Sequence, residues 1–158
     1  MENENKKINH IAIAVPDIKE AALKWQKALN MKKSEIMILE EHGVKVVFLE
    51  FSNLKIELLE PLDNESPISK FLEKNPKGGM HHICFEVEKI TETINSLKNK
   101  NINILGDGNP KIGAHDKPVV FIHPNDLSGT LGELEETDFF LYKTSDPQIL
   151  QIRFCFLL

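Results

Sequence analysis

An internal repeat is the feature of this sequence that most constrains its fold. Three segments of the first half recur in the same order in the second half, at offsets of 82 − 10 = 72, 118 − 45 = 73 and 133 − 57 = 76 residues. Loop insertions between equivalent strands produce such a drift in offset, so the ordered matches indicate a duplicated module. The matched segments are 10–15 with 82–87, 45–50 with 118–123, and 54–58 with 130–134.

Each copy of the module combines strand patterns with one helical pattern. Residues 10–15 (HIAIAV) and 82–87 (HICFEV) alternate in the manner of half-buried strands. Asp17 can cap a helix after the first of these strands, and apolar residues then recur at helical spacing in both halves. These residues are Ile18, Ala22, Trp25 and Leu29 in the first half, and Ile90, Ile94 and Leu97 in the second. Each half is therefore predicted to contain a strand, a helix and then three strands.

A further short helix is predicted between the two modules, within residues 63–77. Ser66 can cap this helix, and Pro67 suits its first position, where a backbone N–H is not needed. Gly78 and Gly79 then lead the chain into the second module. The apolar positions of this helix are Ile68, Phe71 and Leu72.

Composition excludes several classes of function. The chain has 158 residues, 41% of them hydrophobic, which is enough for one well-cored domain or for two small, closely packed modules. Its net charge of −5 argues against nucleic-acid binding, which requires a basic face. No apolar run approaches the roughly 20 residues that span a bilayer, and the start MENENKK lacks the apolar core of a signal peptide. Cys84 and Cys155 form no disulfide or zinc-binding pattern. We therefore expect a cytoplasmic protein with reduced thiols.

Two matched pairs of polar residues are the candidates for chemistry. Strand alternation places His10 and His82 on the face of their strands opposite the predicted helices. Glu57 and Glu133 occupy equivalent places in the last strand of each module. One histidine at a strand start is usually structural, and one strand glutamate is usually solvated. Because both pairs recur, we predict that they converge on a divalent transition metal, leaving two octahedral positions for substrate oxygens.

The motifs around these residues resemble those of methylmalonyl-CoA epimerases, a family of the vicinal-oxygen-chelate superfamily. The resemblance extends from Ile8 to about Glu136, and the motifs are specific as a set rather than singly. They are HIAIAVPD from His10, GVKVVF from Gly43, KIELLEPL from Lys55, MHHICFEV from Met80, PKIGAH from Pro110, FIHP from Phe121 and GTLGEL from Gly129.

This resemblance implies an α+β fold in which paired βαβββ modules form an open, eight-stranded concave sheet. Residues 8–136 would form a single domain, with modules at about 8–62 and 80–136 and a connecting helix within 63–79. Residues 1–7 would be a polar tail, and residues 137–158 an apolar extension of unknown role that is too short to span a membrane. The family also implies a homodimer.

The resemblance also implies a reaction and a set of ligands. His10, Glu57, His82 and Glu133 would hold one cobalt, nickel, manganese or zinc ion, with no further cofactor. The fourth position, that of Glu57, is often glutamine in epimerases. The substrate would be an acyl-CoA thioester, methylmalonyl-CoA, whose 2R and 2S forms interconvert. A metal gripping the thioester and carboxylate oxygens would stabilise the enediolate formed when the C2 proton leaves.

Epimerisation requires a proton-handling group on each face of C2. Glu133 is the predicted catalytic acid/base, in addition to being a ligand. Some epimerases have a second glutamate where this chain has Val46, so the second base is unassigned. Glu50 lies on the same strand face as Val46, but a solvated role suits it better.

The remaining histidines and Cys84 are not predicted to be ligands. His81 is expected in a loop or beside the ligands, His115 in a loop near the mouth of the site, and His123 in a structural role before Pro124. His42 is given no role. Cys84 is expected to be a small buried side chain on the face of His82.

Three other functions compete with the epimerase. Lactoylglutathione lyase, of the same superfamily, resembles this chain in a His, Glu, His, Glu ligand set, and Glu57 slightly favours it. The longer motifs ELLEPL and MHHICFEV favour the epimerase. A ring-cleaving dioxygenase needs two histidines and one carboxylate, so Glu57 argues against it. A metal-free binding or resistance protein would not need all four polar residues.

Overall fold

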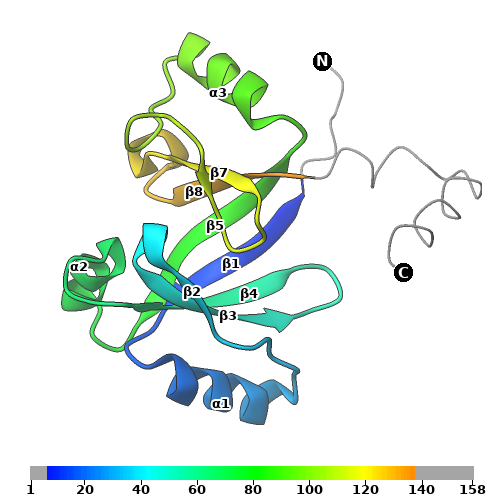
Figure 1. Ribbon diagram of the computed structural model, residues 1–158, viewed down its shortest axis with the longest axis vertical. Helices are drawn as coiled ribbons and strands as arrows, with labels where there is room; N and C mark the ends of the chain where they lie inside the picture. The colour runs from blue at the N-terminus through cyan, green and yellow to red at the C-terminus, as the bar shows by residue number, and fades with distance from the viewer. Residues whose placement is uncertain (1–6, 138–158) are drawn as a thin grey trace, which may run out of the picture.

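The computed structural model describes residues 7–137, which form one curled eight-stranded sheet with three α-helices (Figure 1). The strands follow the order β2-β3-β4-β1-β5-β8-β7-β6 across the sheet. In chain order the elements are β1 (Ile8–Ala14), α1 (Ile18–Leu29), β2 (Met37–Leu39), η1 (Glu40–His42), β3 (Val44–Glu50), β4 (Lys55–Pro61), α2 (Pro67–Lys74), β5 (Gly79–Val87), α3 (Ile90–Asn99), β6 (Lys111–Ile112), β7 (Pro118–Ile122), η2 (Pro124–Leu127) and β8 (Leu131–Glu136).

The two βαβββ modules predicted from the repeat are confirmed. Within each module the first and last strands pair in parallel, β1 with β4 and β5 with β8. The modules join through the antiparallel pairing of β1 with β5 at the centre of the sheet. Figure 1 shows α1 and α3 at opposite ends of the molecule, with the paired strands β1 and β5 between them. The first strands of the two copies are therefore neighbours, which brings equivalent residues together.

Side-chain alternation sorts each strand as expected. Ile11 and Ile13 pack beneath α1, whereas Ala12 and Ala14 face the concave side of the sheet and are fully buried. Asp17 caps α1 by accepting a hydrogen bond from the backbone N–H of Glu20. In the second module α3 packs over a corresponding cluster, which includes Phe85, Val87, Ile90, Ile94 and Leu134.

The concave side is closed at one end by α2. Ser66 caps this helix through its side-chain oxygen, which accepts from the N–H of Ile68. Ile68 is buried against the concave face of the first module. The turn into β5 requires Gly78, whose φ is +83° and where an added Cβ would collide with the carbonyl oxygen of Ala14.

Within residues 7–137 no helix is long and apolar enough to cross a membrane. Cys84 is a buried, free thiol. Cys155 and nearly all of the predicted extension 137–158 lie outside the described residues.

Candidate metal centre and active site

Sheet register brings the four predicted ligands together. In the first module Glu57 lies beside Ala12 of β1 and opposite Phe48 of β3. In the second module Glu133 has the same surroundings, with Cys84 of β5 and Phe121 of β7 in those places. All four predicted ligands are at least 94% buried, and charged or polar side chains are rarely buried so deeply unless they are paired. The equivalence read from sequence is therefore also an equivalence of position in the sheet.

The ligating atoms of these residues converge on one point. The Oε2 atom of Glu133 lies 3.1 Å from the Nε2 atoms of both His10 and His82, which are 3.4 Å apart. The Oε2 atom of Glu57 lies 3.4 Å and 3.7 Å from the same two nitrogens. Bonds of about 2.1 Å to a common ion would separate neighbouring ligands by roughly 3.0–3.4 Å. The cluster therefore has the size of a metal coordination shell, and it is tightest for His10, His82 and Glu133.

A hydrogen bond orients the ring of each histidine. The Nδ2 of Asn9 donates to the carboxylates of Glu86 and Glu135, so the Oδ1 of Asn9 faces His10 and must accept from its Nδ1–H at 3.0 Å. The Nδ1 of His82 is similarly engaged by the Nδ1 of His81, at 2.9 Å. In a neutral ring whose Nδ1 carries the proton, Nε2 has the free lone pair that binds metals.

Both orienting residues are placed by β-bulges. Strict alternation would put Asn9 and His81 on the convex face, away from the ligands. The pairing of β1 with β5 shifts register between Ile8 and His10, leaving Asn9 as the extra residue. It shifts again between Ala12 and Ile13, where His81 is the extra residue of β5. A bulge re-aims its side chain, and these two bulges lie at the equivalent place in each module.

The electrostatics of the cluster require a positive charge. Burial alone would lower the pKa of His10, but hydrogen bonds to Glu133 and Glu57, together with their charges, outweigh burial and raise the pKa to about 10. Burial would likewise raise the pKa of Glu133, yet hydrogen bonds to His10 and His82 hold it well below its ordinary range. Two carboxylates at this depth need a proton or a cation between them. The donor set of imidazole nitrogens and carboxylate oxygens suits a divalent transition metal in the place of that proton.

His81 differs from the ligands in its charge preference. Burial, followed by the nearby charge of His82, lowers the pKa of His81 to about 4. Its ring also meets the edge of Phe71, with the centroids 5.2 Å apart. His81 therefore remains neutral beside His82, which matches the expected position next to the ligands, although it lies in β5 rather than in a loop.

The ligands open onto a cavity of about 740 Å³ within the curled sheet. This volume is in the range of small-molecule and cofactor sites. All four predicted ligands line the cavity, and so does Glu135. The rest of the lining includes residues of η1 and the glycine after it, of the segment before α2, and of the loop that leads into β6 together with the first residue of β6. Among them are Glu40, Glu41, Gly43, Asp63, Ser66, Leu105, Asp107 and Lys111.

A second polar cluster adjoins the cavity, and sequence reasoning missed most of it. Glu135 is 4% exposed, and its Oε2 lies 2.9 Å from the Nδ1 of His115. The Nε2 of His115 lies 2.9 Å from the Nζ of Lys55. The His115 ring lies over Phe48 with the centroids 4.7 Å apart, and 6.2 Å from the ring of His10. Alternation along β8 could have found Glu135, because it lies two residues beyond Glu133 and shares its face.

The other residues considered from sequence lie outside these two clusters. Val46 is fully buried, and Glu50 is exposed at the end of β3, away from the cavity lining. His123 caps η2 by accepting from the N–H of Asn125, which is the structural role expected. His42 bridges the modules, with its Nε2 2.8 Å from the carbonyl oxygen of Ile112. Burial raises the pKa of the Cys84 thiol, as befits an unreactive side chain.

Comparisons with known proteins agree with this geometry. Residues 9–121 match the family model described as the glyoxalase/bleomycin resistance protein/dioxygenase superfamily. An ethylmalonyl-CoA/methylmalonyl-CoA epimerase of Cereibacter sphaeroides is 51% identical over 130 residues, covering 82% of this chain and 97% of that protein. The chain belongs to the methylmalonyl-CoA epimerase family of this superfamily.

Two further relatives of this epimerase family bear on the substrate. The human mitochondrial methylmalonyl-CoA epimerase is 52% identical over 130 residues, which cover 82% of this chain and 73% of that protein. A solved methylmalonyl-CoA epimerase in complex with methylmalonyl-CoA and ammonium has a TM-score of 0.77 and 28% identity. It covers 84% of this chain and 94% of the solved chain.

Proposed function

We propose that this protein is a methylmalonyl-CoA epimerase, which interconverts the 2R and 2S forms of an acyl-CoA thioester substrate. The observation that carries the proposal is the buried cluster of two histidines and two glutamates, in a chain about half identical to proteins named as this epimerase. The relative from Cereibacter is also named for ethylmalonyl-CoA, so a two-carbon branch at C2 is a second substrate to test.

We propose that His10, His82, Glu133 and Glu57 hold one divalent ion, which is cobalt, nickel, manganese or zinc. The convergence of their Nε2 and Oε2 atoms supports this assignment, as do the hydrogen bonds that orient each imidazole. Such an ion would stabilise the negative charge that develops on the substrate oxygens as the C2 proton leaves. Nitrogen and oxygen donors of this kind bind all four of these metals.

The chain's own residues would bind the substrate and move the proton. Glu133 lines the cavity and is proposed to exchange the C2 proton through its carboxylate, in addition to its role as a ligand. Hydrogen bonds to His10 and His82 hold that carboxylate in place and favour its ionised form, which is the form that accepts a proton. Phe48 and Phe121 meet the edges of the two imidazoles, at 5.8 Å and 5.5 Å, and limit their movement.

We also propose that residues 8–136 act as one domain, in a cytoplasmic homodimer. A sheet continuous from β2 to β6 supports the single domain. A free, buried Cys84 suits a reducing compartment. Exposed apolar side chains, among them Ile38, Met80 and Ile112, are available for a subunit contact. Sedimentation equilibrium would test the dimer.

The decisive experiment uses one metal-loaded sample and two substrates. With methylmalonyl-CoA in deuterated water, we expect deuterium to enter C2 as the epimers interconvert. With the hemithioacetal of glutathione and methylglyoxal, we expect no turnover. Turnover of the hemithioacetal without exchange at C2 would assign the protein to the lactoylglutathione lyases instead. Metal analysis of the same sample separates either enzyme from a metal-free binding protein.

A further inference from the structure

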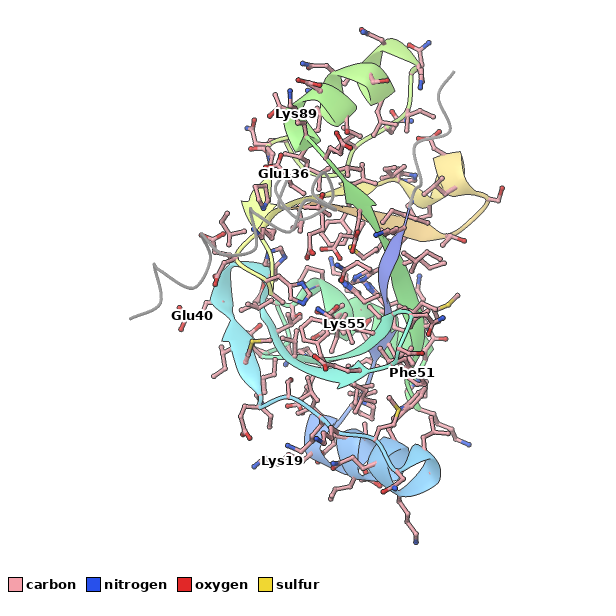
Figure 2. The ribbon with its side chains drawn as sticks, turned by 90° about the vertical axis from the view of Figure 1, so that its right-hand side faces the viewer. Lys19, Glu40, Phe51, Lys55, Lys89 and Glu136 are labelled. Atoms are coloured by element: carbon pink, nitrogen blue, oxygen red, sulfur yellow. The ribbon has the colours of Figure 1, made fainter. Side chains whose placement is uncertain are left out.

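A hydrogen-bonded series of three polar residues lies beside the proposed metal centre and has no part in holding the ion. It runs from Lys55 of β4, through His115 of the loop before β7, to Glu135 of β8. The partners are 60 and 20 residues apart in sequence, so the tertiary fold brings them together. Figure 2 shows Lys55 within the body of the curled sheet, whereas Lys19 and Lys89 project from the surface.

The hydrogen bonds between these three residues all run in one direction, from Lys55 towards Glu135. An ammonium group can only donate, so the Nζ of Lys55 donates to the Nε2 of His115. The His115 ring then carries its proton on Nδ1, which donates to the Oε2 of Glu135. The other oxygen of Glu135 accepts from the Nδ2 of Asn9, at 3.2 Å. The three groups are thus connected as a relay that can deliver a proton to Glu135.

Glu135, the last residue of the relay, lies one strand repeat away from Glu133 in the cavity lining. Glu133 and Glu135 are two residues apart on β8, share a face and both line the cavity. Their backbone positions are therefore separated by one strand repeat, roughly 6.5–7 Å. Reacting atoms in a productive complex lie about 3–3.5 Å apart. A carbon between the two carboxylates would have one on each side at about that distance.

We infer that Glu135 is the second proton-handling group of the site, and that His115 and Lys55 are positioning residues that carry protons to it. This inference rests on the proposed epimerase function, in which C2 loses a proton from one face and gains one on the other. The place that Val46 occupies would then need no carboxylate, because β8 provides both groups.

Every proton in this scheme has a source and a destination. Lys55 passes a proton to the Nε2 of His115, and the Nδ1 proton of His115 moves to Glu135, which becomes a carboxylic acid. Glu133 removes the C2 proton, and the electron pair of that C–H bond stays on the substrate. Glu135 then gives its proton to C2 from the other side, forming the new C–H bond. Glu133 loses its proton to water and Lys55 regains one. The reverse reaction runs each transfer backwards, and no electrons leave the site.

The test follows each epimer separately in deuterated water with a Glu135→Gln variant. Glutamine keeps the shape of the side chain and can still accept from His115, but it cannot carry a proton. We expect interconversion to fall by about 10²–10⁴-fold, the usual effect of losing an acid/base group. From the epimer whose C2 hydrogen faces Glu133, we expect deuterium to enter without inversion at near the wild-type rate. The other epimer should show neither exchange nor inversion.

Two more variants separate the relay from a purely structural role. His115→Gln and Lys55→Met leave Glu135 in place, and each should produce the same one-sided exchange with unchanged metal content. They also supply the test if Glu135→Gln does not fold. The matched control is His123→Asn, because asparagine can still cap η2 and the residue lies away from the cavity. We expect this control to exchange and invert both epimers normally.

Two results would overturn the inference. One is that Glu135→Gln inverts both epimers at the wild-type rate. The other is that exchange falls equally for both epimers in all three relay variants. A failure of the proposed function looks different, because the metal-loaded wild-type protein itself would then exchange neither epimer.

Discussion

The two modules of this protein carry equivalent predicted metal ligands but different flanking residues. Glu57 and Glu133 occupy equivalent sites in β4 and β8, each beside a small residue of the module's first strand. Two residues further along, the first module has the apolar Leu59 where the second has Glu135. Two residues before, the first module has Lys55 where the second has Leu131. Equivalent residues of the two modules would thus surround the proposed ion. The residues that flank them differ between the modules, so the groups near the ion are not the same on its two sides.

The turn before the third strand of each module shows the same divergence. His42 and His115 are equivalent, since 115 − 42 = 73 matches the offset of the following strands. His42 meets a backbone carbonyl of the other module, whereas His115 connects a buried carboxylate to a lysine. Epimerisation at a carbon needs a proton-handling group on each of its two faces. Duplication followed by divergence of the flanks is a direct way to obtain that arrangement.

Removing a histidine ligand should have the largest effect and should not distinguish the modules. His10→Ala and His82→Ala each delete one of the two buried nitrogens that face Glu133. We expect metal content to fall from about one ion per chain to near zero in both variants, and epimerisation to fall below detection. Inductively coupled plasma analysis and a coupled epimerase assay measure the two effects. Full metal occupancy in both variants would contradict the ligand assignment.

Exchanging the two glutamates for glutamine should break the symmetry. Glu133→Gln keeps a metal-binding oxygen but cannot accept a proton, so exchange from the epimer whose C2 hydrogen faces Glu133 should fall by about 10²–10⁴-fold with some metal retained. Glu57→Gln should cost much less, because glutamine is often found at this position in the family that the sequence resembles. Comparing initial exchange rates at equal metal occupancy isolates the catalytic part. Equal losses in the two variants would reject the distinct role of Glu133.

The two bulge residues offer a finer comparison of the modules. Asn9 and His81 are equivalent, since 81 − 9 = 72, and each orients the histidine that follows it. His81→Leu should weaken metal binding by about 10–100-fold, as expected for losing the partner of a metal-ligating histidine. His81→Asn copies the first module and should restore most of the affinity. Calorimetric titration of metal into the metal-free proteins makes the comparison, and a His81→Leu variant with wild-type affinity would contradict it.

The smallest predicted effect concerns the pH dependence of the metal-free protein. The pKa of His10 is raised to about 10, so its contribution to stability is complete below the ordinary value of 6.5 and is lost as the pH rises towards 10. The lowered pKa of Glu133 acts oppositely, because its contribution is present above 4.5 and is lost as the pH falls. The metal-free protein should therefore be most stable at about pH 4.5–6.5.

Thermal unfolding across this pH range, with and without metal, measures the effect. A bound cation replaces the proton of His10, so the metal-loaded protein should lose little stability between pH 6.5 and pH 9. His10→Gln is a suitable control, because it removes the titrating group. An equally steep fall in unfolding temperature for metal-free wild type and His10→Gln would show that His10 is not responsible.

Patterns local to the chain were enough to predict the two modules and the four candidate ligands. Apolar residues recur every two residues in a strand and every 3.6 residues in a helix, and both patterns can be read from one segment of the chain. The repeat at offsets of 72 to 76 residues identifies equivalent strands without any knowledge of their packing. Alternation then assigns a face to each side chain, which was enough to place His10, Glu57, His82 and Glu133 on the concave side.

The side chains that support those four residues could be identified only after the strands and loops were placed in three dimensions. Alternation would have turned Asn9 and His81 away from the site, and the bulges between β1 and β5 reversed that. Side-chain alternation could have placed Lys55 and Glu135 on the inner face of the sheet, but it could not have shown that His115 connects them. The reason is physical: face and period depend on neighbouring residues along one chain segment. Bulges, loop paths and the curl of a sheet depend on contacts between segments that are far apart in sequence.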